Sequence, residues 1–246
     1  MCLIIDIHAH IWGGRIEQDK SEIIKACEIY NISKVYVSGL RGHYPDKDEI
    51  DELNYEVYKF IKEHPDHIGG FCYVNPVHDN CMDVLRKGIE DYHMEGMKLW
   101  VATFCDDPRV FPLVEKCIDY NIPILIHSWK KSVGQLEFET IGTRVANLAS
   151  RYPEARLIMA HLDGNCYYGI KCIKKYKNVW VDFSGSIYRR DDLDYTVEQI
   201  GAERIVFGTD MVGSFLVNYG QVEEANLTPE QKEMIYYKNA LKVLHG

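Results

Sequence analysis

The sequence has no long apolar segment and no excess of basic residues. Among its 246 residues, 28 are Lys or Arg and 37 are Asp or Glu, giving a formal charge of −9. Nucleic acids and anionic membranes attract basic surfaces, so this balance argues against either partner, although local cations could still bind an anionic substrate. No run is long enough to cross a bilayer, and the first residues lack the basic start of a signal peptide. We therefore expect a cytoplasmic protein.

Paired cysteines and nucleotide-binding loops are also missing. None of the eight cysteines stands in a C-x-x-C pair, which excludes a zinc ribbon and a thioredoxin motif. Several cysteines, Cys72 and Cys117 among them, lie inside apolar runs, as reduced and buried thiols do. The G-x-G-x-x-G and Walker-type loops of nucleotide-binding sheets do not occur.

Short apolar runs, rich in Val, Ile, Leu and aromatic residues, recur along the whole chain. Each is bounded by Gly, Pro, Asn or a polar loop, as strands are. The runs cover residues 2–10, 34–40, 69–76, 96–102, 123–128, 156–164, 178–186 and 204–211. With 46% hydrophobic residues, the chain can bury a large core.

Amphipathic segments separate these runs. The last, "TPEQKEMIYYKNALKVL", opens with Thr228 as a helix cap, Pro229 in the first turn and Gln231 at the capping-box position. Regular alternation of strand and helix implies a parallel sheet, and eight units in about 250 residues imply a closed (β/α)8 TIM barrel. A doubly wound open sheet is the alternative. No linker or compositional break appears, so we expect one domain over residues 1–246.

The run "IDIHAH" ends with two histidines. Side chains alternate along a strand, so His8 and His10 share a face, and they point to the barrel mouth if Ile7 and Ala9 pack outward against helices. The same alternation would place Asp6 on the face of His8, deeper in the barrel. Taken alone, the pair is equally compatible with metal ligands and with polar residues at a solvent-exposed strand end.

Other apolar runs end in the same kind of residue. His127 follows "PILI", His161 follows "LIMA", Asp210 ends "IVFGTD", and Lys98 lies in "GMKLW". Parallel strands of a barrel bring their carboxyl ends to one mouth, where catalytic residues stand. Burying such groups without partners costs several kcal/mol each, and a shared divalent metal would remove that cost.

In this pattern the sequence resembles the amidohydrolase superfamily, and most closely its amidohydrolase-related, metal-dependent TIM-barrel branch. The resemblance rests on "IDIHAH", "GMKL", "IPILIHS", "AHLDG" and "VFGTDM", which occur in this order over nearly the whole chain. That superfamily contains hydrolases of amides, lactones and esters together with some non-oxidative decarboxylases. The resemblance therefore implies a site more closely than a substrate.

The resemblance implies that His8, His10, His127 and Asp210 hold a divalent metal, with Zn²⁺ as the expected ion. Such an ion lowers the pKa of bound water toward ~7. Asp210 would also accept the proton of that water and pass it to the leaving group. His161 would polarise the substrate carbonyl or bind a second metal.

Lys98 leaves the metal count open. A carboxylated lysine at this position bridges two ions in two-metal relatives, whereas in one-metal relatives Lys98 would bind a substrate carboxylate or form an ion pair. Trp100, the next inward-facing residue, would narrow the pocket under either interpretation. The loop after His127 offers Trp129 and Lys130 as contacts for a carboxylate-bearing small molecule.

Three functions remain open at this point. The leading hypothesis is a metal-dependent hydrolase of a small amide, lactone or ester. The alternative is a metal-dependent non-oxidative decarboxylase of a small aromatic or muconate-like acid. A metal-binding barrel without catalysis is the third, although Asp210 and His161 supply the expected catalytic groups.

Ser184 and Ser186 are not predicted nucleophiles, because no Gly-x-Ser-x-Gly elbow surrounds them. The sequence is compatible with a homo-oligomer.

Overall fold

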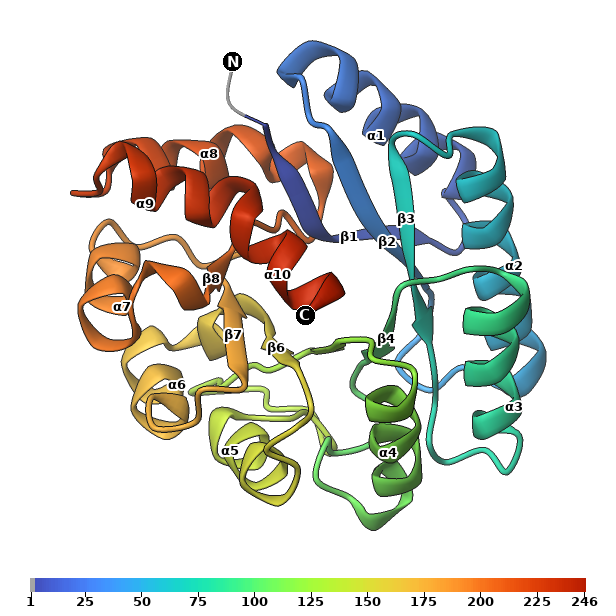
Figure 1. The fold of residues 1–246 in the computed structure, drawn as a ribbon. Coiled ribbons are helices and arrows are strands. Elements are labelled where there is room, and N and C mark those ends of the chain that lie inside the picture. Colours follow the sequence, from blue (N-terminus) through green and yellow to red (C-terminus); the bar gives the residue numbers. More distant parts are fainter. Residues whose placement is uncertain (1–2) are drawn as a thin grey trace.

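The computed structural model describes residues 3–246, and its eight parallel strands form one barrel-like sheet in the order β1 to β8. Each strand pairs with the next along the chain, and helices lie around the outside (Figure 1). The strands are β1 (Ile5–Trp12), β2 (Lys34–Leu40), β3 (Ile68–Tyr73), β4 (Gly96–Leu99), β5 (Ile124–Ile126), β6 (Leu157–Met159), β7 (Val179–Asp182) and β8 (Ile205–Val206). The predicted TIM barrel is confirmed. Cys2, the first residue of the first apolar run, lies outside the described residues.

Hydrogen bonds between β1 and the segment at β8 close the ring. The amide of Ile7 donates to the carbonyl of Phe207 over 3.0 Å, and the amide of Asp210 donates to the carbonyl of His8 over 2.7 Å. Ala9 and Asp210 form a parallel bridge. Because this closure runs through His8 and Asp210, the fold itself holds two predicted site residues side by side.

The outer helices follow the predicted alternation. They are α1 (Ile16–Tyr30), α2 (Lys47–Glu63), α3 (Cys81–Arg86), α4 (Phe111–Asp119), α5 (Gly142–Arg151), α6 (Cys166–Ile173), α7 (Asp192–Ile200), α8 (Phe215–Glu224), α9 (Pro229–Glu233) and α10 (Asn239–His245). The predicted capping box of Thr228 and Gln231 begins α9, and a π-helical turn at Met234–Lys238 joins α9 to α10.

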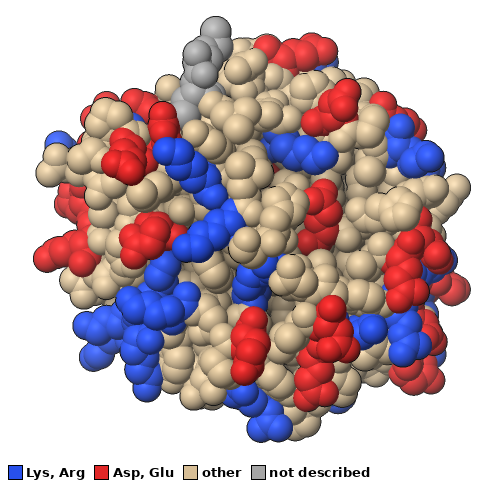
Figure 2. Space-filling model, in the orientation of Figure 1, with Lys and Arg blue, Asp and Glu red and all other residues tan. Residues whose placement is uncertain are grey.

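Helix α10 covers one end of the barrel. Its residues Ala240, Val243 and Leu244 pack with side chains of β1 and of six other strands in one buried cluster, which places that cluster inside the ring. Figure 1 shows α10 crossing the centre of this end. Acidic and basic side chains are interspersed over the same face (Figure 2). The site residues lie toward the opposite end, where the strands terminate.

A β-bulge in β1 changes the expected orientation of two residues. The register with β2 shifts between Asp6 and Ala9, so the strict alternation of side chains is interrupted there. Ile7 packs inside the barrel with the α10 cluster and not outward as expected, while Ala9 belongs to the outer core. His8 still enters the mouth, because the bulge resets the alternation just before it.

The same bulge gives Asp6 a different position from the one expected. Asp6 alternates with the inward-facing Ile5 and Ile7 and therefore faces away from the barrel interior. Its buried carboxylate accepts hydrogen bonds from the Thr209 hydroxyl (2.6 Å), the Thr209 amide and the His8 amide (both 3.1 Å). Asp6 thus ties β1 to the residue before Asp210.

Candidate metal centre

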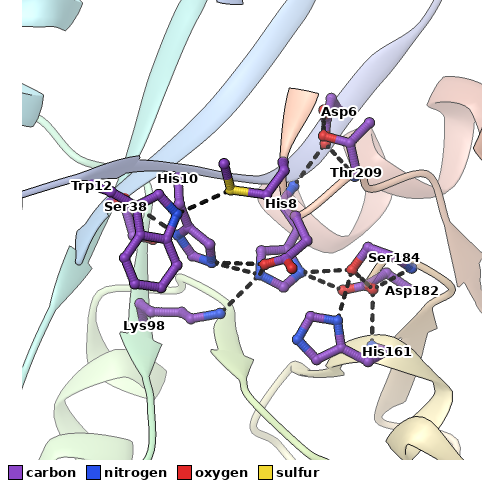
Figure 3. Close-up of polar contacts among 12 residues, drawn as sticks. Asp6, His8, His10, Trp12, Ser38, Lys98, His161, Asp182, Ser184 and Thr209 are labelled. Carbon is purple, nitrogen blue, oxygen red and sulfur yellow. Dashed lines mark hydrogen bonds and ion pairs between the residues drawn. The ribbon is translucent and has the colours of Figure 1, made fainter. Parts of the chain in front are cut away.

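Side chains from the ends of several strands converge at the mouth of the barrel (Figure 3). The Nε2 atoms of His8 and His10 lie 3.0 Å apart, and Oδ1 of Asp210 lies 3.7 Å from the first and 3.4 Å from the second. The Nζ of Lys98 lies 2.9 Å from the same Nε2 of His8. His8, His10 and Lys98 are buried, as predicted for residues that converge rather than face solvent.

The back of each β1 imidazole is held by an acceptor. The Nδ1 of His8 lies 2.9 Å from a carboxylate oxygen of Asp182, and the Nδ1 of His10 lies 3.3 Å from the carbonyl oxygen of Ser38. These acceptors assign the ring hydrogen to Nδ1 in both residues, which leaves a lone pair on each Nε2. Metal-binding histidines are oriented by outer acceptors in this way.

The donor set fits a divalent metal. Two lone pairs 3.0 Å apart repel each other unless a proton or a cation lies between them. One ligand atom each from His8, His10 and Asp210 lies within 4.8 Å of the others. Two imidazoles and a carboxylate suit Zn²⁺, Mn²⁺ and similar ions, so these residues can hold such an ion.

Electrostatics keep the imidazoles neutral and the carboxylate charged. Burial lowers the pKa of His8 well below its ordinary value, with Lys98 adding to the effect. Burial would raise the pKa of Asp210, but its close contact with His10 and the neighbouring imidazole rings outweigh burial and hold the pKa well below the usual range. A neutral imidazole and an ionised carboxylate are the protonation states that metal ligation requires.

Asp210 reaches the cluster through a strained backbone. Its φ is +64°, in the left-handed region that side-chain-bearing residues avoid. The main-chain bond to the His8 carbonyl and the bridge to Ala9 hold it there. Strain of this kind persists where the surroundings enforce it, which is common at functional sites.

Lys98 is the fully buried cation of the site. Burial lowers its pKa to about 8. Its ammonium group donates to the Nε2 lone pair of His8, the same lone pair that a metal ion would use. A metal on His8 and this hydrogen bond therefore exclude each other, so Lys98 must release His8 when an ion binds.

His161 is connected to His8 through Ser184 and Asp182. Its Nδ1 lies 3.0 Å from the hydroxyl oxygen of Ser184, and that hydroxyl donates to Asp182 over 2.5 Å. Since the hydroxyl hydrogen is used on Asp182, Nδ1 of His161 is the donor to Ser184, and Nε2 carries a lone pair. Burial lowers the pKa of His161 to about 4. In this state His161 presents an acceptor and not the N–H group that would polarise a carbonyl.

His127 lies apart from the His8–His10–Asp210 group. Its Nε2 is 3.0 Å from Glu139, a buried residue of the loop before α5, and its ring centroid is 5.1 Å from that of His161. The nitrogen left for a metal is Nδ1. The structure does not bring His127 into the cluster of ligand atoms, and its ligand role stays a prediction.

Sequence reasoning missed Asp182 and Glu139. Asp182 ends the run "NVWVD" as β7 ends, so the rule that identified the histidines would also have found it. It also accepts the amide of His161, 3.0 Å away. Nothing in the sequence singles out Glu139, because it lies in a loop and not at a strand end.

A pocket of about 280 Å³ opens beside this cluster. It is lined by His43, Trp100, Val101, His127, Trp129, Lys131, Leu136, Glu139 and Ser186. Trp100 and Trp129, which the sequence predicted as pocket residues, are among these lining residues. Lys130 is not among the lining residues; its Nζ lies over the ring of Tyr168 in α6, 5.9 Å from the ring centroid. Lys131, the next residue in the chain, lines the pocket instead of Lys130.

Eight parallel strands with a His and Asp cluster at their carboxyl ends define a TIM-barrel protein with a candidate metal centre. The chain belongs to the amidohydrolase family, whose model matches residues 5–246. A comparison with curated proteins finds no match. The resemblance read from the motifs is confirmed, and with it the expectation of an amidohydrolase-type enzyme at the level of the family.

Solved structures share the fold over nearly the whole chain. A putative amidohydrolase from Staphylococcus aureus has a TM-score of 0.78 at 15% identity, covering 98% of this chain and 99% of its own. A 2,6-dihydroxybenzoate decarboxylase from Rhizobium has a TM-score of 0.76 at 14% identity, covering 99% of both chains. A 5-carboxyvanillate decarboxylase from Novosphingobium aromaticivorans, solved with bound manganese, has a TM-score of 0.79 at 13% identity, covering 99% and 97%.

No helix within residues 3–246 is long and apolar enough to cross a membrane.

Proposed function

We propose that this protein is a metal-dependent, non-oxidative decarboxylase of a small planar carboxylic acid. The observation that carries the proposal is a pocket with tryptophan walls that is lined by His127, the further predicted metal ligand. Trp100 and Trp129 line it, and the ring of Trp129 stacks on His127 with an angle of 19° between the planes. Flat aromatic surfaces favour a flat, conjugated ligand. The similar structures named as decarboxylases of hydroxylated benzoates support the same substrate class.

The metal is proposed to bind between His8, His10 and Asp210, with His127 as a further ligand through Nδ1. When bound, such an ion would hold the substrate carboxylate and a neighbouring oxygen and withdraw electron density from them. Manganese in a similar structure makes Mn²⁺ a candidate beside the expected Zn²⁺.

The chain's own residues would move the proton. Loss of CO₂ breaks a carbon–carbon bond, and the carbon left behind must gain a proton. Asp210, whose pKa is held well below its usual range, would take the proton of a hydroxyl beside the substrate carboxylate and deliver it to that carbon, and solvent would later return a proton to the ionised oxygen. The electron pair of the broken bond then restores the conjugated ring as CO₂ departs. His8 is held by Asp182 throughout, which keeps Asp210 and the substrate aligned.

Hydrolysis of a small amide, lactone or ester is the second candidate. It is supported by the contact of Asp210 with both β1 histidines, because a carboxylate beside these candidate ligands could accept a proton from water activated there. His161 would then act as an acceptor or as a further ligand rather than as a donor to the carbonyl, given its hydrogen bond to Ser184.

Product analysis separates the two functions. Protein loaded with Mn²⁺ or Zn²⁺ would be incubated with hydroxybenzoates, muconate-like acids, lactones and amides, while CO₂ and acid titre are followed. We expect CO₂ release in proportion to loss of an aromatic or muconate-like acid, and no release after chelation. Turnover confined to lactones, esters or amides, without CO₂, would contradict the proposal and favour the hydrolase.

Lys98 tests the number of metal ions. The two groups of ligand atoms in the described chain share His8, so they are not independent sites, and we expect one ion per chain. Replacing Lys98 with Met, which keeps the volume of the buried side chain, should leave the metal content per chain unchanged. Lys98→Ala is the companion variant. A fall from two ions to one in both variants, measured by elemental analysis, would show that Lys98 bridges two ions.

A further inference from the structure

Lys131 stands in the pocket wall, where it pairs with Glu139 and keeps further N–H donors for a ligand. It lies on the loop between β5 and α5, and its side chain is 28% exposed. It is the single Lys or Arg among the residues that line this pocket. The one hydrogen bond described for its ammonium group goes to Oε1 of Glu139, 2.8 Å away, and an ammonium group carries three N–H donors.

Both oxygens of the Glu139 carboxylate, the partner of Lys131, already accept hydrogen bonds from within the chain. Oε1 of Glu139 is shared by Lys131 and the Nε2 of His127, while Oε2 accepts the side-chain amide of Gln135 and the main-chain amide of Leu136. The Glu139 side chain is 2% exposed. With both oxygens occupied from within the chain, Glu139 offers no acceptor to a ligand. The group that Lys131 and Glu139 together present to the pocket is the ammonium.

Lys131 and the candidate metal centre offer a ligand two different polar contacts. Lys131 and His127 contact the same oxygen of Glu139, so Lys131 lies beside His127. Both residues line the pocket, whereas His8, His10 and Asp210 are not among its lining residues. The tryptophan walls described above lie at the same mouth. The ring of Trp100 is also flanked by His43, with centroids 5.4 Å apart. A flat ligand bound to the metal centre at one end would therefore direct its other end toward a cation.

We propose that Lys131 forms a subsite for a second carboxylate, so that the preferred ligands are planar aromatic dicarboxylic acids. One carboxylate lies at the His8–His10–Asp210 cluster and the other pairs with the Lys131 ammonium. The subsite deepens the proposed function and rests on it for the statement that the first carboxylate is the one lost. Recognition of the second carboxylate is a binding property and can be measured without turnover.

The test compares isophthalate with benzoate, which lacks the second carboxylate. Binding of each to Mn²⁺-loaded protein would be measured by titration calorimetry, with quenching of tryptophan fluorescence as a parallel signal. A charge-assisted hydrogen bond is worth about 1.5–3 kcal/mol, so isophthalate should bind roughly ten- to a hundredfold more tightly than benzoate. Lys131→Met should abolish this preference, and Lys131→Arg should retain most of it.

Lys130→Met is the matched control, since Lys130 is the adjacent residue and its ammonium lies over Tyr168, outside the pocket. This variant should keep the wild-type preference. Thermal unfolding of Lys131→Met checks that the loop survives; Glu139 retains its other three donors there. Equal binding of the two acids by wild-type protein, or a preference that persists in a folded Lys131→Met, would overturn the subsite.

The two proposals fail separately. If isophthalate is preferred through Lys131 but no acid releases CO₂, the subsite stands and the decarboxylase function falls. If CO₂ is released from monocarboxylic acids while isophthalate has no advantage, the function stands and the subsite falls.

Discussion

Replacing Asp210 with Asn is expected to lower kcat/KM by about three orders of magnitude, within the 10²–10⁴ range typical of a lost acid–base group. The amide keeps the shape of the side chain but cannot take up and deliver a proton. Asp210 lies 3.4 Å from Nε2 of His10 and 3.7 Å from that of His8, and its pKa is held well below the usual range for an aspartate. Steady-state rates with the best substrate of the product analysis would measure the effect.

Asp66→Asn is a suitable control for this loss, because Asp66 is exposed and lies just before β3, at the opposite end of the barrel. It should leave kcat/KM unchanged. Metal content of Asp210→Asn must be measured in parallel, since a variant that has simply lost its ion would be inactive for another reason. Activity within tenfold of wild type in Asp210→Asn would remove Asp210 from the proton-transfer role.

Replacing His10 with Ala should weaken metal binding by more than about a hundredfold, because even outer-shell substitutions cost 10–100-fold. His10 contributes a ring nitrogen whose other side is held by the Ser38 carbonyl, so the lone pair is oriented before the ion arrives. An ion present at a hundred times its dissociation constant stabilises the folded state by about 2.7 kcal/mol. His10→Ala should lose that stabilisation.

Thermal unfolding with and without Mn²⁺ or Zn²⁺ would measure this loss, together with the metal retained after dialysis. His67→Ala is the matched control: His67 is exposed and precedes β3, far from the strand ends that carry the site. Metal should raise the melting temperature of wild type and His67→Ala equally. An equal rise in His10→Ala would show that the ion binds elsewhere.

Hydrophobic patterning predicted the fold and most of the strand-end cluster. Lys98 and Asp182 show why the rule works: each occupies an inward position at the end of a strand whose outward neighbours pack against helices. The expected alternation of side chains failed at Ile7 and Asp6. A β-bulge in β1 shifts the alternation there, and no residue type in the sequence indicates the bulge. The rule does not apply to loops, where Lys130 was named as a possible contact although Lys131 lines the pocket.

The functional hypothesis changed more than the fold. The motifs favoured hydrolysis, whereas the proposed function is loss of CO₂, for which the tryptophan walls of the pocket are the main observation. Both proposed reactions would use the same metal site and the same Asp210. The residues that decide between them therefore line the pocket, and these come from loops whose paths the motifs do not specify.

By itself the sequence determined a closed parallel barrel and the convergence of His8, His10, Lys98, His161 and Asp210, because alternation and strand ends are local properties that a linear pattern records. Only the tertiary structure decided which nitrogen of each imidazole is free, since the acceptors Asp182, Ser38 and Glu139 come from distant segments. It also decided that Lys131 lines the pocket and that both oxygens of its partner Glu139 are already hydrogen-bonded. Hydrogen bonds between residues far apart in the chain leave no periodic signal.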